Sequence, residues 1–415
     1  MRIPRPTLVL AAVLMTAAAA TGCGDGFEEP ADPGQQQQEG DGDLTILFGS
    51  SGEAETAAVK DAAARWAAKS GKKAEAIPAQ DLTQQLGQGF AGGTPPDVFY
   101  VSPDFLRQYA EGGSLYPYGD QLEDADDFFP ALRDTYTYEG ELYCAPKDLS
   151  AHALVINTAF WQEAGLTDAD IPTTWEQLAA VAQRLTTGGR VGLAFTGDHN
   201  PVGTFLLQGG GWYLNEDGTQ VTADTPENLA TLEYLKANLD AGTFAFAKNI
   251  DAKWGGEALG TGKAAMTVEG GWVVGALQKD FPQVQWKAVP MPKGPGGAGT
   301  TVFSNCWGIA AASSDRAAAV DLVKFLTSPE EQQTFATAFG ATPSRQSLTE
   351  WNAEQFPASA AFNDPEGGHG PVTAPGFASV LQAFNTGLEG IAAGTADPKQ
   401  VLADLQRDGE EALSK

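Results

Sequence analysis

Short apolar runs alternate with helical patterns in the first part of the chain. Three runs at residues 44–48, 72–79 and 97–101 are predicted to be strands, and the first of them is an apolar run typical of a buried strand. The first run is followed by a helical pattern with one apolar face, which we expect to end at Gly71. Helical patterns also follow the other two runs. This alternation predicts a mostly parallel sheet with helices on both faces.

The alternation breaks at residues 127–157 and then resumes. Within the break, residues 135–146 are typical of a hairpin that turns at Glu139-Gly140. Beyond it, strands are predicted at 191–197, 263–268, 285–292 and 301–312, with helices between and after them. About 370 residues follow Asp43, too many for one typical core, so we expect two lobes.

The N-terminal segment has the pattern of a secretory signal. Two arginines precede an apolar run at 8–20 that is too short to span a bilayer comfortably. The run leads into ATGC, which resembles a bacterial lipobox, although Ala20 stands where leucine is preferred. We therefore expect a lipoprotein signal peptide at 1–22 and lipidation of Cys23, the alternative being a plain signal with an incidental cysteine. The acidic, glutamine-rich residues 23–43 predict a flexible tether.

The charge and the cysteines narrow the function further. A formal net charge of −28 argues against nucleic acid and against an anionic membrane surface as partners. Apart from Cys23, the sequence has Cys144 and Cys306, which suggest one disulfide in an oxidising compartment, the alternative being two buried thiols. The three histidines show no ligand spacing, so we expect neither a metal nor a cofactor.

Several segments, taken in order, resemble the extracellular sugar-binding proteins of ABC importers of the maltose-binding-protein type. Asn157 occupies the asparagine that ends the crossover strand in that family, and Trp272 stands where the family carries a sugar-stacking tryptophan. The similar segments are residues 93–113, 145–165, 260–277 and 300–345.

The resemblance implies an α/β, two-lobe periplasmic-binding-protein fold (type II), with the lobes joined by crossover strands at a hinge. It places the N-terminal lobe at 44–147 plus 305–345 and the C-terminal lobe at 149–303 plus 350–415. It further implies a monomer, lipid-anchored at the extracellular face of the cell membrane, that delivers a sugar to an ABC permease. Cys144 and Cys306 would then lie on strands near the hinge.

Ligands of open α/β sheets bind beyond the carboxyl ends of the strands, and this rule selects the candidate residues. They are mostly hydroxyl, amide, charged and aromatic side chains in the loops that follow strands. The candidates are Ser50, Ser51, Glu53, Ser102, Asp104, Lys147, Asp148, Ser150, Asn200, Trp212, Trp254, Glu269, Gly270, Trp272, Asn305, Trp307 and Arg345.

A sugar requires this mixture of groups because its ring has apolar C–H faces and a hydroxyl rim. An aromatic face covers the C–H patch, and charged side chains form the stronger hydrogen bonds with the rim. We expect the glycines at 270 and 271 to let Trp272 turn its face into the cleft, while Glu269 meets the ring hydroxyls.

Several candidates also have a structural alternative, and Glu53 could be only an acid in the first turn of a helix. Trp272, Trp212 and Trp254 could be core residues, Asp104 could only cap a helix, and Arg345 could pair with a surface acid. Two other functions stay open at this point. One is a secreted glycoside hydrolase with paired acids, although no nucleophile or metal motif is present and we expect no enzyme. The other is the same fold binding a polyol, polyamine or peptide.

Overall fold

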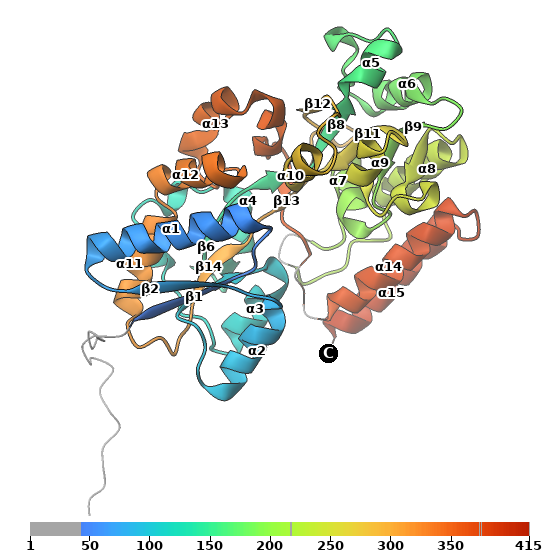
Figure 1. Cartoon of the computed structure of the whole chain (residues 1–415). Helices are drawn as coiled ribbons and strands as arrows, with labels where there is room; N and C mark the ends of the chain where they lie inside the picture. Colours follow the sequence, from blue (N-terminus) through green and yellow to red (C-terminus); the bar gives the residue numbers. More distant parts are fainter. Residues whose placement is uncertain (1–42, 216–217, 373, 375, 415) are drawn as a thin grey trace, which may run out of the picture. The chain divides into compact units, whose positions relative to one another are not determined.

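The computed structural model describes residues 43–215, 218–372, 374 and 376–414, which form two α/β lobes around separate five-stranded sheets (Figure 1). The predicted signal peptide at 1–22, the lipidation site Cys23 and the tether up to residue 42 lie outside the described residues. Short 3-10 helices lie at Gly119–Gln121, Ala125–Asp127, Asp168–Asp170, Ala247–Ile250, Gln346–Leu348 and Pro357–Asn363.

The sheet of the first lobe has the strand order β2-β1-β3-β14-β6. β1 is parallel to β2 and β3, whereas β14, which comes from much later in the chain, is antiparallel to β3 and β6. Helices cover both faces, so β3 and β14 are buried throughout and are apolar apart from one glycine. The strands are β1 (Leu44–Phe48), β2 (Ala74–Pro78), β3 (Val98–Val101), β6 (Ala145–Pro146) and β14 (Cys306–Ile309).

The helices of the first lobe pack their apolar faces on this sheet. The predicted end of the first helix is confirmed, because Gly71 adopts a left-handed conformation with φ of 75°. Trp66, on the same helix, is buried in the core of the lobe. The helices are α1 (Glu53–Ser70), α2 (Leu82–Gly92), α3 (Pro103–Glu111), α4 (Pro130–Thr135), α11 (Arg316–Leu326) and α12 (Pro329–Phe339).

The sheet of the second lobe has the order β10-β9-β11-β8-β12. The central strand β11 is parallel to β9 and antiparallel to β8, and all six of its residues are buried. It ends at Glu269, directly before the two glycines and Trp272. The strands are β8 (Ala153–Asn157), β9 (Val191–Phe195), β10 (Phe244–Phe246), β11 (Ala264–Glu269) and β12 (Trp286–Val289).

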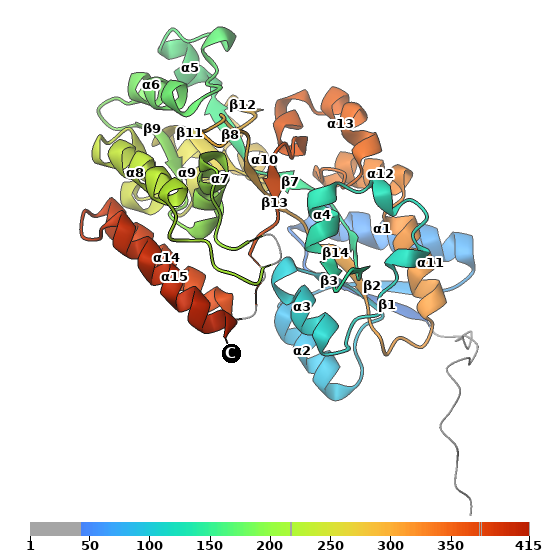
Figure 2. The ribbon, with the colours of Figure 1, turned by 180° about the vertical axis from the view of Figure 1, so that it is seen from behind.

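The helices of the second lobe surround this sheet, and α14 and α15 form an antiparallel pair beside α8 (Figures 1 and 2). Thr174 is the N-cap of α6, and its hydroxyl accepts the backbone N–H of Gln177. The helices are α5 (Thr158–Glu163), α6 (Trp175–Leu185), α7 (His199–Gly209), α8 (Pro226–Asp240), α9 (Gly255–Gly260), α10 (Trp272–Lys279), α14 (Phe377–Ala392) and α15 (Pro398–Leu413). A further helix, α13 (Thr349–Gln355), packs against the 3-10 helix at Pro357–Asn363 and lies beside α12 (Figure 1).

A small sheet of order β15-β13-β7 lies where the chain passes between the lobes (Figure 2). The single apolar run predicted at 301–312 is therefore two strands in different sheets, with Ser304 and Asn305 between them. The polar pair interrupts the run at the point where the chain leaves the hinge. The hinge strands are β7 (Ser150–Ala151), β13 (Thr300–Phe303) and β15 (Gly368–His369).

Two local predictions in the first lobe are confirmed. Glu139 and Gly140, both with positive φ, join β4 (Thr137–Tyr138) to β5 (Glu141–Leu142) in an antiparallel hairpin. Cys144 and Cys306 form a buried disulfide with a Cα–Cα distance of 5.5 Å. Both cysteines belong to the first lobe, but they are 162 positions apart because the strands of the second lobe lie between them in the sequence.

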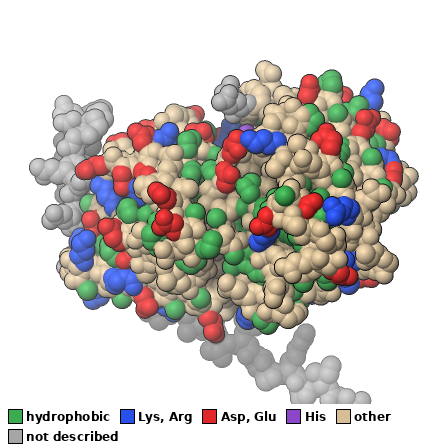
Figure 3. All heavy atoms as spheres, turned by 90° about the horizontal axis from the view of Figure 1, so that it is seen from above, with side chains coloured by type: hydrophobic (Ala, Val, Ile, Leu, Met, Phe, Trp, Pro, Cys, Tyr) green, Lys and Arg blue, Asp and Glu red, His purple; other side chains and the backbone are tan. Residues whose placement is uncertain are grey.

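Charged side chains of both signs are interspersed over the face of the molecule seen in Figure 3. Across the described ranges, none of the helices combines the length and the hydrophobicity that a membrane span needs. The same ranges contain no group of three or more side chains placed to hold a metal ion.

Candidate functional site

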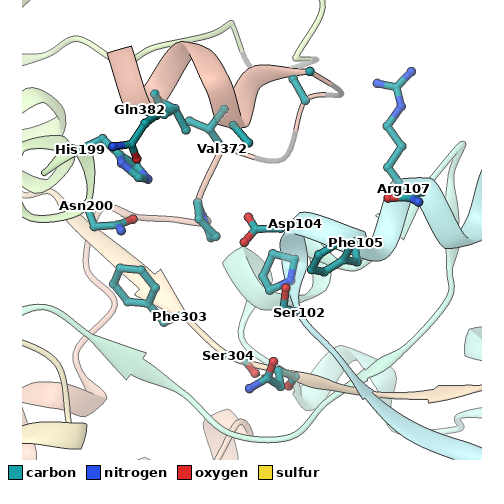
Figure 4. Close-up of a pocket in the computed structure, with 18 of the residues that line it drawn as sticks. Ser102, Asp104, Phe105, Arg107, His199, Asn200, Phe303, Ser304, Val372 and Gln382 are labelled. Carbon is teal, nitrogen blue, oxygen red and sulfur yellow. Dashed lines mark hydrogen bonds between the residues drawn. The ribbon is translucent and has the colours of Figure 1, made fainter. Parts of the chain in front are cut away.

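A cleft of about 1150 Å³ is lined by segments of both lobes and of the hinge. The first lobe contributes α3 and the residue before it, and the hinge contributes residues of β7 and β13 and their neighbours. The second lobe contributes residues of α7 and α14, some of which are labelled in Figure 4, and Trp272. Seven of the predicted residues line this cleft: Ser102, Asp104, Asp148, Ser150, Asn200, Trp272 and Asn305.

Trp272 supplies an exposed aromatic surface at the hinge end of the cleft. Its side chain is 47% exposed, although tryptophan is a residue that proteins usually bury. His152 and Phe303 pack against the indole in T-shaped arrangements, with ring centroids 5.8 and 5.3 Å from that of the indole. The indole therefore has a fixed orientation and an open surface.

Gly270 allows the indole to lie close to the backbone. A Cβ atom at this position would meet the Trp272 ring at 2.3 Å and the Ser150 hydroxyl at 2.6 Å, so any other residue would displace the indole or the hydroxyl. The Gly271 N–H also donates to Ser150 Oγ at 2.7 Å, and this bond joins the loop before Trp272 to hinge strand β7. Gly270 is thus a packing requirement of the site.

Glu269 lies behind the indole instead of at the sugar-accessible rim. The side chain is buried, and its Oε2 accepts the Trp272 Nε1–H at 2.7 Å while its Oε1 accepts the Gly256 N–H at 3.2 Å. Burial raises the pKa of the Glu269 carboxyl to about 7, although both hydrogen bonds favour the charged form. This position corrects the expectation that Glu269 meets ring hydroxyls: it positions Trp272 instead.

Asp104 and His199 line the cleft from opposite lobes (Figure 4). Asp104 is in the first turn of α3 and His199 is the first residue of α7. Partial desolvation in the cleft raises the pKa of Asp104, and the charge of His199 opposes this rise. Next to His199, Asn200 also lines the cleft, and its backbone N–H is accepted by Asp198, the N-cap of α7. Hydrogen-bonding side chains of both lobes therefore line the same cleft.

Asp148 lines the cleft beside the hinge, whereas Lys147 lies behind it. The Lys147 ammonium donates to Glu55 at 2.8 Å and forms an ion pair of 2.7 Å with Asp148. It also lies over the ring of Tyr100, 4.8 Å from the centroid. Burial by itself would lower the pKa of Lys147, but the two carboxylates and the neighbouring tyrosine raise it well above the ordinary value. Lys147 thus supports the cleft wall without lining it.

Three other predicted residues are buried in the lobes. Trp307 is fully buried in the core of the first lobe, because helix α11 packs on its strand, β14. Arg345 is 2% exposed and pairs with Asp124 and Asp127. Trp212 packs in the core of the second lobe. These positions correct the cleft location expected for all three.

The remaining predicted residues are also absent from the cleft wall. Trp254 is half-buried against the apolar cluster around Val273. The N–H and hydroxyl of Ser51 both donate to Glu55, and Ser50 donates to the Gly52 carbonyl, so these groups organise the start of α1. Glu53 is an exposed residue in the first turn of the same helix.

The cleft also contains residues that the sequence analysis missed. Phe303 was read only as part of an apolar strand, and residues of α14 only as part of a C-terminal helix. Gln382 and Asn385 offered a signal, since two amides three residues apart share one face of a largely apolar helix. The other missed residues include Phe105, Arg107, Gln108, Glu111, His199 and Ser304.

Comparisons with known proteins agree with this architecture. Residues 62–364 match the family model described as bacterial extracellular solute-binding protein. The lactose-binding protein of Rhizobium radiobacter is 25% identical over 261 residues, which is 59% of this chain and 60% of that relative.

Two solved structures show the same fold. A cyclo/maltodextrin-binding protein complexed with maltotetraose superposes with a TM-score of 0.79 at 19% identity, over 91% of this chain and 98% of the other. The cyclic alpha-maltosyl-1,6-maltose binding protein from Arthrobacter globiformis superposes with a TM-score of 0.78 at 23% identity, over 90% of this chain and 99% of the other. The predicted two-lobe α/β fold is confirmed.

Proposed function

Since the chain belongs to the bacterial extracellular solute-binding proteins, we propose that it captures a carbohydrate between its lobes and delivers it to an ABC permease in the membrane. The relatives support the sugar class, because one is named for lactose and another, from Pyrococcus abyssi, for maltotriose. Their names describe those proteins, and the ligand of this chain is inferred from the cleft.

The observation that carries the proposal is the exposed indole of Trp272 in the cleft. Among the described residues, it is one of two large apolar side chains that are clearly exposed, the other being Ile77 on β2. The loop glycines, Ser150 and Glu269 all hold the indole in this position. A sugar ring covers such a surface with its C–H face, and its hydroxyls can reach Asp104, Asn200 and Asn305 at the rim.

Binding then favours closure of the lobes. A sugar that contacts α3 on one side and α7 and Trp272 on the other makes its full set of contacts only when both walls approach it. Unpaired hydroxyls of a wrong sugar would leave buried polar groups, each costing about 1–3 kcal/mol, and this cost provides specificity. The proposed role is capture without chemistry.

A hydrolase is the rival function that requires a test. Its two acids would be Asp104 and Asp148, but Asp148 is already engaged in an ion pair of 2.7 Å with Lys147. Incubation of the protein with labelled oligosaccharides should leave them intact, and the appearance of shorter products would contradict a binding role.

The proposed location is the outer face of the cell membrane. Lipidation of Cys23 would anchor the chain there, and residues 24–43 would let the lobes reach the permease. Metabolic labelling with palmitate should give a labelled, membrane-associated protein. The Cys23→Ala variant should carry no label and should not associate with the membrane. An unlabelled wild-type protein in the culture medium would contradict the anchor.

Calorimetry of the purified protein tests the sugar class directly. The panel consists of lactose, malto-, arabino- and chito-oligosaccharides, sorbitol, spermidine and a tripeptide mixture. We expect binding of at least one carbohydrate and none of spermidine or peptides. Binding of spermidine or peptides without any carbohydrate would overturn the proposal.

A further inference from the structure

His199 is held at the second-lobe wall of the cleft by hydrogen bonds to its backbone and to its ring. It is the first residue of α7, so its backbone N–H has no partner within the helix, and Asn385 Oδ1 on α14 accepts it at 2.8 Å. The same oxygen lies 3.2 Å from the imidazole Nδ1. The His199 carbonyl accepts the Tyr213 hydroxyl at 2.7 Å. The position of the imidazole is therefore set before a ligand binds.

The two bonds to Asn385 also decide which ring nitrogen carries the proton. A backbone N–H always donates, so the amide atom that it meets must be the oxygen and not the NH₂ group. That oxygen cannot donate to the ring, and Nδ1 of His199 must therefore be the donor. In a neutral imidazole the other nitrogen, Nε2, then has a lone pair and no proton. Asn385 thus makes His199 a hydrogen-bond acceptor.

The Nε2 atom of His199 is open to the cleft. The residue lines the cleft, and the described residues include no partner for Nε2. Nε2 is also absent from the buried polar atoms that lack a partner in the described part of the chain, so solvent can reach it. The lone pair is therefore available to a ligand.

The group that faces His199 from the first lobe is a second acceptor. Figure 4 shows Asp104 on the wall opposite His199 and Asn200. Over the described ranges, the Asp104 carboxylate makes no hydrogen bond or ion pair, and a carboxylate can only accept. Two acceptors cannot bond to each other, so closure of the lobes requires donors between them. Hydroxyl groups of a sugar can supply these donors.

We infer that His199 is a specificity-determining residue whose Nε2 accepts one hydroxyl of the ligand, and that Asn385 is the positioning residue that fixes this polarity. The inference rests on the proposed carbohydrate function and deepens it. A ligand must place hydroxyl donors toward both His199 and Asp104. A sugar that lacks the hydroxyl at His199, or carries a methyl ether there, leaves the Nε2 lone pair unpaired.

The first test measures the position of the proton in the protein without a ligand. A long-range proton–nitrogen NMR correlation at about pH 8, where imidazole side chains are normally neutral, distinguishes the two tautomers. The chain has three histidines, and the His199→Asn variant identifies the signal of His199. We expect the proton on Nδ1, and we expect Asn385→Leu to lose this preference. A proton on Nε2, or an imidazolium, would overturn the inference.

The second test is calorimetry with the tightest-binding carbohydrate and its single-deoxy analogues. We expect the wild-type protein to bind one analogue about tenfold more weakly, because that analogue lacks the hydroxyl at Nε2. The amide of His199→Asn can still donate to Asn385 but does not reach the position of Nε2. This variant should bind the parent sugar about tenfold more weakly and should not distinguish it from that analogue by more than about twofold.

Two further variants control this measurement. The His199→Gln variant should keep part of the discrimination, because its amide oxygen can take the place of Nε2. His369→Asn is the matched control and should keep all of it, since His369 is a half-buried histidine on β15 that does not line the cleft.

Two kinds of failure can be told apart. If His199→Asn weakens the parent sugar and every analogue by the same factor, or weakens none of them, His199 does not read a hydroxyl and the inference fails while sugar binding stands. If the wild-type protein binds no carbohydrate of the wider panel, the proposed function itself fails, and the specificity role fails with it whichever tautomer is found.

Discussion

The indole N–H of Trp272 donates to the buried carboxylate of Glu269 at 2.7 Å, and this bond connects the exposed wall of the cleft to the end of the central strand β11. The acceptor is buried and the donor is half exposed, so the bond fixes a ring that would otherwise rotate in solvent. The two residues therefore have different roles: Glu269 holds the indole in place, and Trp272 faces the cleft.

Replacement of Trp272 should affect binding much more than stability. Trp272→Ala removes the aromatic surface, and we expect sugar affinity to fall at least about tenfold in calorimetry. Because the side chain is nearly half exposed, the free energy of unfolding should change by less than about 1 kcal/mol. Trp272→Phe is the control and should retain part of the affinity. A stable alanine variant with unchanged affinity would contradict the role of the indole.

The raised pKa of Glu269 predicts a specific pH dependence of stability. The folded-state pKa is about 7 and the ordinary value is 4.5, so the folded protein binds the extra proton between these values. The contribution of Glu269 to stability is therefore fully present below about pH 4.5 and is lost as the pH rises through 7. In denaturant titrations, the Glu269→Gln variant should not show this loss. The difference in free energy of unfolding between the variant and the wild type should therefore shift in favour of the variant as the pH rises from 5 to 8. Parallel pH profiles would contradict the prediction.

The buried ammonium of Lys147 should be important for stability. Lys147→Met leaves Glu55 buried without its cation, although Tyr100 and Ser51 still donate to it. We expect the free energy of unfolding to fall by about 3 kcal/mol in a denaturant titration. Lys236→Met, which breaks an exposed pair on α8, is the matched control and should cost less than about 0.5 kcal/mol. Equal effects of the two variants would contradict a stabilising network.

Reduction of the disulfide should lower stability without abolishing ligand binding. Cys144 and Cys306 lie within one lobe and are absent from the cleft wall. Replacing both by alanine should reduce the free energy of unfolding by about 3 kcal/mol, because the bridge restricts the unfolded chain. Mass spectrometry before and after reduction verifies the bridge in the wild-type protein. A double variant as stable as the wild type would show that the bridge contributes little.

Much of the candidate site was predictable where the position depends on local sequence. Ser102, Asp104 and Trp272 directly follow strands β3 and β11, and the rule that ligands bind at strand ends needs only the strand pattern. The rule fails for Trp307 because that residue is inside strand β14, and helix α11, from a later part of the chain, packs on that strand.

Arg345 and Glu269 show that the local sequence pattern does not reveal whether a charged side chain is buried. The chemistry of a charged side chain suits a cleft, but its burial depends on which partners the fold brings to it. Asp124 and Asp127 reach Arg345 from more than 200 positions earlier in the chain, and the ring of Trp272 covers Glu269. Phe105 and Arg107 were missed for the converse reason: their helix looks like an ordinary amphipathic one until the opposite lobe is in place.

By itself, the sequence determined the alternation of strands and helices, the two-lobe class and the cysteine pair, because these depend on periodicity, chain length and composition. Only the tertiary structure decided which polar and aromatic side chains share the cleft. Burial and facing walls arise from contacts between segments that are far apart in the sequence, such as α3, α7 and α14, and no local pattern encodes those contacts.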